Sequence, residues 1–330
     1  MKSFKRVAWA AWGVLLTGCA TSPTFVNSNS SIARDETALY RDILFEAVII
    51  FVIIVGALIW SLIRDRARRD QKAPPKQTYG KITWAVGAAV LVLMVDGLDF
   101  GLMVSTLNKV RAPAPTSADL NLHVIGHRWW WEFDYPDLGI KTANELHIPV
   151  GTNVRVTLDS VDVIHSFWAP QLTGKTDAIP GQTNHMWLRA DEPGKFHGQC
   201  SEFCGTEHAL MRLQVIAQTQ SDFDAWAANQ QKPAATPKTE AEQAGYKIVT
   251  TTCSTCHSLD PGDPRTDLTG PNLTHLFSRS KFAGASFDLN ETNIRNWVHN
   301  TQAMKPGNDM NITIKQQDLD NVVAYLKLLH

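Results

Sequence analysis

The sequence predicts a multi-domain chain with a two-helix transmembrane hairpin, an all-β sandwich and a small all-α domain. Two apolar runs, residues 43–63 and 82–107, are each long enough to cross a bilayer as a helix. From residue 119 onward, short β-branched or alternating segments are separated by Gly, Pro and Asp, as in a sandwich or barrel. Amphipathic helical patterns return after residue 240. A chain of 330 residues is long enough to hold these parts.

The N-terminus has the pattern of an export signal. Basic residues precede an apolar run over residues 7–16, which small residues follow. We therefore expect a signal peptide over residues 1–18 and a polar tether over 19–38. The stretch Leu-Thr-Gly-Cys that ends at Cys19 resembles a bacterial lipobox, which implies a lipoprotein with lipidated Cys19. An ordinary signal, cut nearby, is the alternative.

The hairpin is expected over residues 39–111. Six Arg and Lys residues follow the first span within residues 64–76, so the positive-inside rule makes this loop cytoplasmic and places both ends outside. The second span contains Asp96 and Asp99. Carboxylates inside a membrane are costly and usually functional. The alternative is a shifted helix that brings both of them near the outer interface.

The β-domain is expected over residues 119–227, between a stiff Pro-rich linker at 112–117 and a second linker at 228–240. Residues 119–219 carry 7 basic and 12 acidic side chains, a balance that would attract a basic protein partner, although a solvated surface explains it too. The formal net charge of the whole chain is −1, and nothing indicates nucleic-acid binding.

A cluster of soft ligands lies in the β-domain. Cys200 and Cys204 are followed by His208 and Met211 and preceded by a distant His165. Sulfur and imidazole select copper or zinc, and a thioether favours copper. Two thiolates can bridge two metals with one His on each, which describes a binuclear copper centre. A zinc site and a disulfide are the alternatives, but a disulfide over so short a loop would stabilise little.

The helical domain, expected over residues 241–330, contains a haem-attachment motif. Cys253, Cys256 and His257 form C-x-x-C-H, in which the two cysteines bind haem covalently and the histidine ligates the iron. A distal Met would raise the reduction potential and favour electron transfer. Met304 and Met310 are the candidates.

Residues 120–219 resemble the copper domain of subunit II of haem-copper respiratory oxidases. The motifs are GHRWWWEF at 126–133, DVIHSFW at 162–168, KTDAIPG at 175–181 and the segment 197–211. The resemblance implies a cupredoxin-like sandwich with a dinuclear CuA centre, whose ligands would be His165, Cys200, the Glu202 carbonyl, Cys204, His208 and Met211.

The same resemblance implies further roles. The Glu202 side chain would bind magnesium at the boundary with subunit I, and Trp129 would be the point where electrons enter. Core packing is the alternative for Trp129 and the better explanation for Trp130 and Trp131.

Residues 241–330 resemble a class I cytochrome c domain. The run KPGNDM that ends at Met310 resembles the Lys-Pro-Gly-x-x-Met of cytochrome domains fused to oxidase subunit II, which implies that Met310 is the axial ligand. The proline that usually follows is Asn311 here. We expect Met304 to pack in the core or a loop, and His275, His299 and His330 to be surface residues.

The nearly full-length resemblance, as in cytochrome-c-fused (caa-type) oxidases, implies an electron-input subunit of a proton-pumping cytochrome c oxidase. Electrons from cytochrome c or a quinol–cytochrome c reductase complex would pass through haem c and CuA to subunit I, where oxygen is reduced to water. Subunits I and III would be partners. We expect a two-pass protein of the bacterial inner membrane with both metal domains on the periplasmic face.

Three departures from the family pattern keep an alternative open. Lys81 stands where a Glu of a proton-uptake channel is expected, Arg128 where Gln is frequent, and Gln182 where Arg is frequent. The alternative is the same electron relay in a copper-containing nitric oxide reductase. A copper-binding or copper-delivery protein is a further alternative, which the covalent haem argues against.

Overall fold

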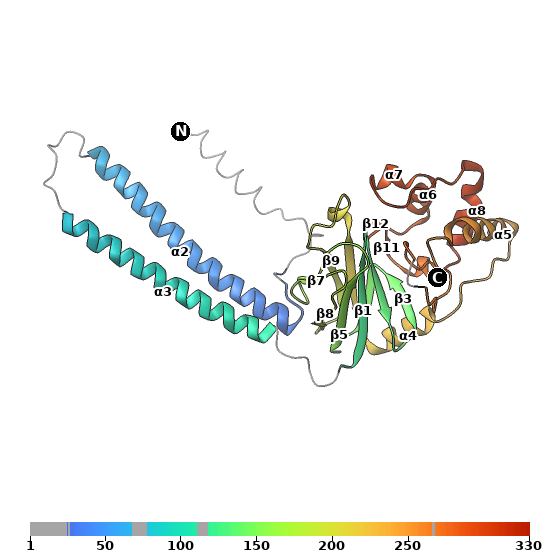
Figure 1. Cartoon of the computed structure of the whole chain (residues 1–330), viewed down its shortest axis with the longest axis horizontal. Coiled ribbons are helices and arrows are strands. Elements are labelled where there is room, and N and C mark those ends of the chain that lie inside the picture. Colours follow the sequence, from blue (N-terminus) through green and yellow to red (C-terminus); the bar gives the residue numbers. More distant parts are fainter. Residues whose placement is uncertain (1–24, 26, 68–77, 111–117, 266–267) are drawn as a thin grey trace, which may run out of the picture. The chain divides into compact units, whose positions relative to one another are not determined.

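The computed structural model describes residues 25, 27–67, 78–110, 118–265 and 268–330 (Figure 1). The predicted signal peptide, Cys19 and the linker at 112–117 lie outside the described residues. The described residues divide into two units: one holds residues 31–67 and 78–110, and the other holds residues 25, 27–30, 118–265 and 268–330.

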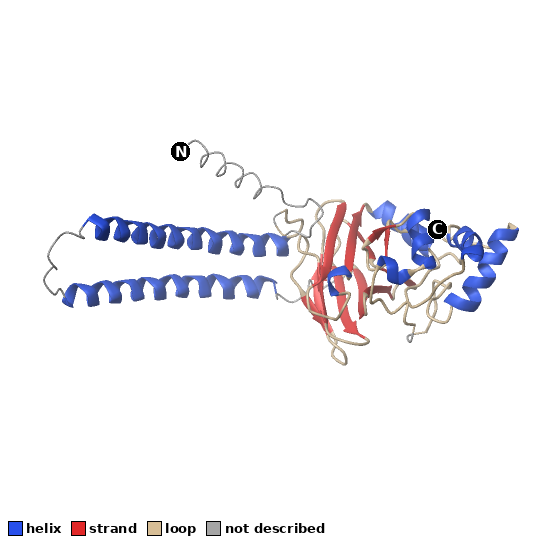
Figure 2. Ribbon diagram, turned by 90° about the horizontal axis from the view of Figure 1, so that it is seen from above, coloured by secondary structure: helices blue, strands red, loops and turns tan. Residues whose placement is uncertain are grey.

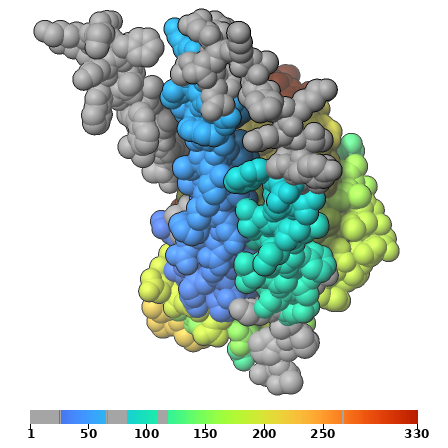
Figure 3. Space-filling view, turned by 90° about the vertical axis from the view of Figure 1, so that its left-hand side faces the viewer, coloured from blue at the N-terminus to red at the C-terminus, as the bar shows by residue number. Residues whose placement is uncertain are grey.

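The smaller unit is a helical hairpin. Its helices are α2 (Ser31–Ala67) and α3 (Thr78–Val110), which pack side by side (Figure 3). Both contain apolar stretches long enough to span a membrane, Ser31–Arg64 and Thr83–Asn108. Their large apolar side chains are exposed, as in helices that face lipid. The expected tether is wrong over residues 31–38, because good helix formers such as Ala33, Glu36 and Ala38 extend α2 there.

The two intramembrane aspartates have different surroundings. The carboxyl group of Asp99 in α3 faces that of Glu46 in α2. Asp96 is exposed on the hairpin. Asp99 therefore lies against the other helix of the hairpin, and its Oδ1 is buried without a hydrogen-bond partner among the described residues.

The β-domain is a sandwich of two five-stranded sheets, which confirms the predicted all-β architecture (Figure 2). The first sheet has the order β3 (Ile140–Ala143), β2 (Trp130–Tyr135), β1 (Leu120–His127), β5 (Val154–Ser160) and β8 (Asn184–Leu188). The second has the order β4 (Glu145–Pro149), β10 (Arg212–Gln218), β9 (Gly194–Cys200), β6 (His165–Trp168) and β7 (Thr176–Ala178).

Aromatic side chains fill the space between the sheets. Trp131 and Phe133 from β2 are fully buried, and both make edge-to-face contacts with Phe167 from β6. Alternate residues of β1, which include Leu122 and Val124, point into the same core. Helix α4 (Gln220–Gln230) packs on the sandwich and takes in the first residues of the expected linker, so residues 231–239 connect it to the next helix.

The C-terminal domain is built mainly from short helices. Its elements are α5 (Glu240–Ile248), η2 (Val249–Cys253), η3 (Leu276–Ser278), β11 (Lys281–Phe282), β12 (Phe287–Asp288), α6 (Glu291–His299), α7 (Thr301–Met304) and α8 (Gln316–Leu326). Thr239 and Glu242 form a capping box that begins α5. The last helix is amphipathic, as the pattern after residue 240 predicts: Leu319, Val322, Val323 and Leu326 are buried, and so is Leu329 just beyond its end.

Helices α5 and α8 cross closely at Gly245. A Cβ atom at this position would lie 1.9 Å from the Asn321 carbonyl oxygen, so only glycine permits the crossing. Next to it, the rings of Tyr246 and Tyr325 meet edge to face at 5.2 Å. The crossing fixes the two helices that frame this domain.

Gly245→Ala is expected to destabilise the C-terminal domain by about 1–3 kcal/mol, because the added methyl group forces the helices apart. Thermal unfolding of the full chain, followed by helical circular dichroism, measures the effect. Gly262→Ala is the matched control, since a Cβ atom at Gly262 would lie 3.9 Å from Asp260 Oδ1, an ordinary contact distance. Equal melting temperatures for the two variants would contradict the expected result.

Candidate functional site

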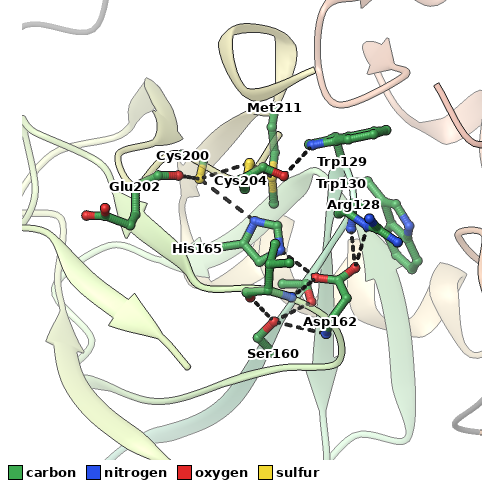
Figure 4. Close-up of polar contacts among 12 residues, drawn as sticks. Arg128, Trp129, Trp130, Ser160, Asp162, His165, Cys200, Glu202, Cys204 and Met211 are labelled. Carbon is green, nitrogen blue, oxygen red and sulfur yellow. Dashed lines mark hydrogen bonds and ion pairs between the residues drawn. The ribbon is translucent and has the colours of Figure 1, made fainter. Parts of the chain in front are cut away.

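The predicted copper ligands meet at one end of the sandwich (Figure 4). His165 begins β6 and Cys200 ends β9, and these two strands are hydrogen-bonded neighbours. The following loop carries Cys204, η1 (His208–Leu210) carries His208, and Met211 directly precedes β10. Pairing of three strands thus brings residues that are 35 to 46 positions apart in the sequence to one cluster.

The donor atoms form a continuous set around the two sulfurs. Cys200 Sγ lies 3.8 Å from Cys204 Sγ, 3.9 Å from His165 Nδ1 and 3.2 Å from the Glu202 carbonyl oxygen. Cys204 Sγ lies 3.6 Å from His208 Nδ1 and 3.8 Å from Met211 Sδ. Each sulfur thus has its own histidine and its own weak ligand.

Asp162 holds the His165 ring in place. Its Oδ1 lies 2.8 Å from His165 Nε2, and the backbone N–H groups of Arg128 and Val163 donate to the same carboxylate. With Nε2 bonded to the carboxylate, Nδ1 is the nitrogen that faces Cys200. Such an outer carboxylate fixes the ring orientation and tautomer of a metal-binding histidine.

The two buried thiols cannot both ionise without a cation. The contact with Cys204 lowers the pKa of Cys200, and the same contact, together with burial, raises the pKa of Cys204. One proton is therefore retained between two sulfurs that are almost inaccessible to solvent. A bound metal replaces such a proton and allows both thiolates to form.

The donor set fits a copper pair. Both cysteines are free, so the disulfide alternative is wrong. Two sulfurs, two imidazole nitrogens, a thioether and a carbonyl are ligands that soft and borderline metals prefer. When bound, copper would supply a one-electron redox centre whose ligands are already in place.

A second site is a cavity lined by the haem-attachment residues. Cys253, Cys256 and His257 border it together with apolar side chains of the helical domain. His257 Nδ1 bonds to the Pro271 carbonyl oxygen at 2.7 Å, and burial lowers the pKa of His257. The ring is therefore neutral, with Nε2 available for iron. A Cβ at Gly270 would lie 2.4 Å from the His257 ring, so glycine is required there.

Two further residues of this cavity suit a haem. Met310 lines it, whereas Met304 packs against the hydrophobic core, which supports the predicted choice between them. Arg279 also lines the cavity, and its Nε is buried without a hydrogen-bond partner among the described residues. This guanidinium would suit the propionate groups that a haem carries.

The three tryptophans at 129–131 have separate roles. Trp131 packs in the sandwich core, as expected. Trp130 does not: it stacks on His127 at 4.0 Å and donates from Nε1 to the carbonyl oxygen of Thr269 in the helical domain. Trp130 is thus buried, as expected, but against the helical domain and not between the two sheets. Trp129 lines the haem cavity and donates from Nε1 to the Cys204 carbonyl oxygen at 2.9 Å.

Other residues near the sites differ from expectation or lacked a sequence signal. His275 was expected at the surface but is buried, between the carbonyl oxygens of Lys232 and His330. Glu145 and the β11–β12 segment join the two domains of the larger unit, and no periodicity marks them. The Glu202 side chain, the expected magnesium ligand, is exposed and lies 3.9 Å from Lys175.

Comparison with known proteins decides the family. Residues 139–218 match the profile described as cytochrome c oxidase subunit II, periplasmic domain, and residues 242–330 match cytochrome c. Cytochrome c oxidase subunit 2 of Alkalihalophilus pseudofirmus is 34% identical, over 96% of this chain and 94% of that protein. The chain belongs to the cytochrome c oxidase subunit II family.

Other subunit II proteins have similar matches. Those of a Bacillus species and of Bacillus subtilis are 33% and 31% identical, over 80% and 79% of this chain and 79% of each relative. A solved periplasmic domain of subunit II from Bradyrhizobium japonicum is 35% identical, covers 35% of this chain and 95% of its own, and has a TM-score of 0.34. This chain is therefore a haem-copper oxidase subunit with a fused cytochrome c domain, which implies copper and haem c.

His208→Gln is expected to remove the mixed-valence copper signal, because one of the two metals loses its imidazole. Electron paramagnetic resonance and copper content of the purified chain measure this. His197→Gln is the matched control, since His197 contacts Gln214 on the neighbouring strand rather than the sulfur cluster. Loss of the signal in both variants would contradict the assignment.

Met310→Leu is expected to lower the haem reduction potential and open the reduced iron to carbon monoxide, because a thioether ligand stabilises the reduced state and closes the site. Redox titration and carbon monoxide difference spectra measure both effects. Met304→Leu should change neither. If instead Met304→Leu opens the iron, the axial ligand is Met304.

Proposed function

We propose that this subunit accepts electrons from an external donor at its haem domain and passes them through the copper centre to subunit I, for reduction of oxygen to water. One observation carries the proposal: Trp129 lines the haem cavity and hydrogen-bonds to the backbone of a copper-ligand residue, Cys204. When bound, haem c and the copper pair supply the one-electron carriers on either side of this residue.

The helical domain covers Trp129, and this determines where an electron from a separate donor can enter. Its side chain is buried, and Gly284 of the helical domain lies against its backbone. A separate donor protein therefore cannot approach Trp129 directly and would deliver its electron to the haem domain. The proposed donor is cytochrome c or a quinol–cytochrome c reductase complex.

Electrons would leave the copper centre toward subunit I through the exposed surface of the copper loops. Phe203 is 77% exposed and Ile164 43% exposed, although both flank ligand residues. Exposed apolar side chains next to a buried site are typical of protein interfaces. We propose that subunit I covers them, and that the nearby Glu202 carboxylate binds magnesium at that boundary.

The membrane hairpin supports a two-pass protein of the bacterial inner membrane, with both metal domains on the periplasmic side and subunits I and III as partners. A lipid on Cys19 would add a second anchor. Lys81 lies in α3 where the family often has a Glu that delivers protons. We propose that the complex pumps protons and that the uptake route does not use this position.

Gas consumption by the purified complex tests the terminal reaction. With a reducing donor present, oxygen uptake is expected and nitric oxide uptake is not. Nitric oxide consumption without oxygen uptake would favour the reductase alternative. Copper that exchanges freely and gives no mixed-valence signal would favour a copper-delivery protein.

Trp129→Leu is expected to slow electron transfer from haem to copper by about 10- to 100-fold, because the aromatic contact and its hydrogen bond to Cys204 are both lost. Flash reduction of the haem, followed by optical detection of copper reduction, measures the rate. Trp187→Leu is the control, since Trp187 lies on β8 against Arg155. Equal transfer rates in Trp129→Leu, Trp187→Leu and the unaltered chain would exclude Trp129 from the electron-transfer path.

A further inference from the structure

The loop that carries the copper ligands is also the surface on which the haem domain rests. The backbone N–H of Arg212 donates to the Gly284 carbonyl oxygen at 2.9 Å. The hydroxyl of Ser286 donates to the Leu210 carbonyl oxygen at 2.7 Å. Copper-loop residues 205–212 thus pair with the turn between β11 and β12, which no sequence pattern predicted.

Two glycines of the haem domain make this contact close. Gly284 and Gly307 have φ angles of +70° and +91°, which favour glycine. A Cβ at Gly284 would lie 2.7 Å from the Leu210 carbonyl oxygen, and one at Gly307 would lie 2.7 Å from the Thr206 side chain. At both glycines, the backbone of the haem domain therefore lies directly against the copper loop.

A buried ion pair crosses this contact. Lys305 Nζ lies 3.1 Å from Glu207 Oε2, and the two side chains are only 4% and 2% exposed. Glu207 directly precedes the predicted copper ligand His208. Lys305 begins the segment that leads to Met310, the predicted iron ligand. The pair therefore joins the ligand segment of one site to the ligand loop of the other.

A second buried carboxylate anchors the same two domains. Glu145, 1% exposed on β4, accepts hydrogen bonds from the Ser280 N–H, the Ser280 hydroxyl and the Lys281 N–H. All three donors belong to the haem domain. This contact lies at the start of β11, whereas the segment that leads to Met310 meets the copper loop through Lys305 and Gly307.

We propose that Lys305 and Glu207 form a positioning pair that holds the axial-ligand segment of the haem domain against the copper loop and so sets the rate of electron transfer between the two sites. The proposal rests on the proposed function, in which electrons pass from haem to copper. It assigns a specific role to a contact between two side chains that belong to neither predicted ligand set.

Lys305→Met is the direct test, because it leaves Glu207 buried without its cation. Loss of one partner of a buried ion pair is strongly unfavourable, so the haem domain should separate from the copper loop. In the full chain within the purified complex, we expect haem-to-copper transfer to slow by at least about tenfold. Lys305→Arg should restore the rate, and Lys327→Met is the control, since its ion pair with Glu291 is exposed.

Two measurements separate positioning from damage to either site. In Lys305→Met, the copper resonance signal should be unchanged and the reduced haem should stay closed to carbon monoxide. Amide hydrogen exchange at residues 205–212 and 280–286 should be faster than in the unaltered chain. The double variant Lys305→Met with Glu207→Gln removes both charges, and its transfer rate should recover toward that of the unaltered chain.

An unchanged transfer rate and unchanged hydrogen exchange in Lys305→Met would overturn the proposed positioning role. A slow rate together with an altered copper signal or a haem that binds carbon monoxide would overturn it as well, because the pair would then support one site directly. Absence of haem-to-copper transfer in the unaltered chain would instead contradict the proposed function. The two failures are therefore distinguishable.

Discussion

The copper end of the molecule depends on the approach of two sulfur atoms to 3.8 Å in a place that solvent barely reaches. Two thiolates at that distance repel each other, and a shared proton or a bound cation must compensate. The surrounding structure maintains the approach: Cys200 is held at the end of a paired strand, and Asp162 and Trp129 fix His165 and the Cys204 backbone. Ligand geometry is thereby set before metal arrives.

The short copper loop faces two different neighbours. Toward the helical domain it presents backbone carbonyls and a buried carboxylate, which meet glycines and Lys305. On another part of its surface it presents the exposed Phe203 and the Glu202 carboxylate. Polar, closely fitted contact serves a permanent neighbour in the same chain. An uncovered apolar side chain fits a partner that assembles later.

Local patterns predicted much of this architecture. Apolar run length indicated the hairpin, short alternating segments indicated the β-sandwich, and amphipathic patterns indicated the C-terminal helices. Ligand chemistry also predicted the clusters around Cys200 and His257, because metal ligands must be particular residue types. Contacts between domains were not predictable in this way. Trp130, Glu145 and His275 each pair with a residue at least 43 positions away, and no local repeat encodes such a pairing.

Residues 231–239, which connect α4 to α5, affect how strongly the haem and copper domains associate. A connection this short keeps the haem domain at an effective concentration on the order of millimolar beside the copper domain. The contact between them can then be small and largely polar and still be occupied nearly all the time. Cutting the chain there would leave two domains with the same complementary surfaces, and their association would depend on dilution.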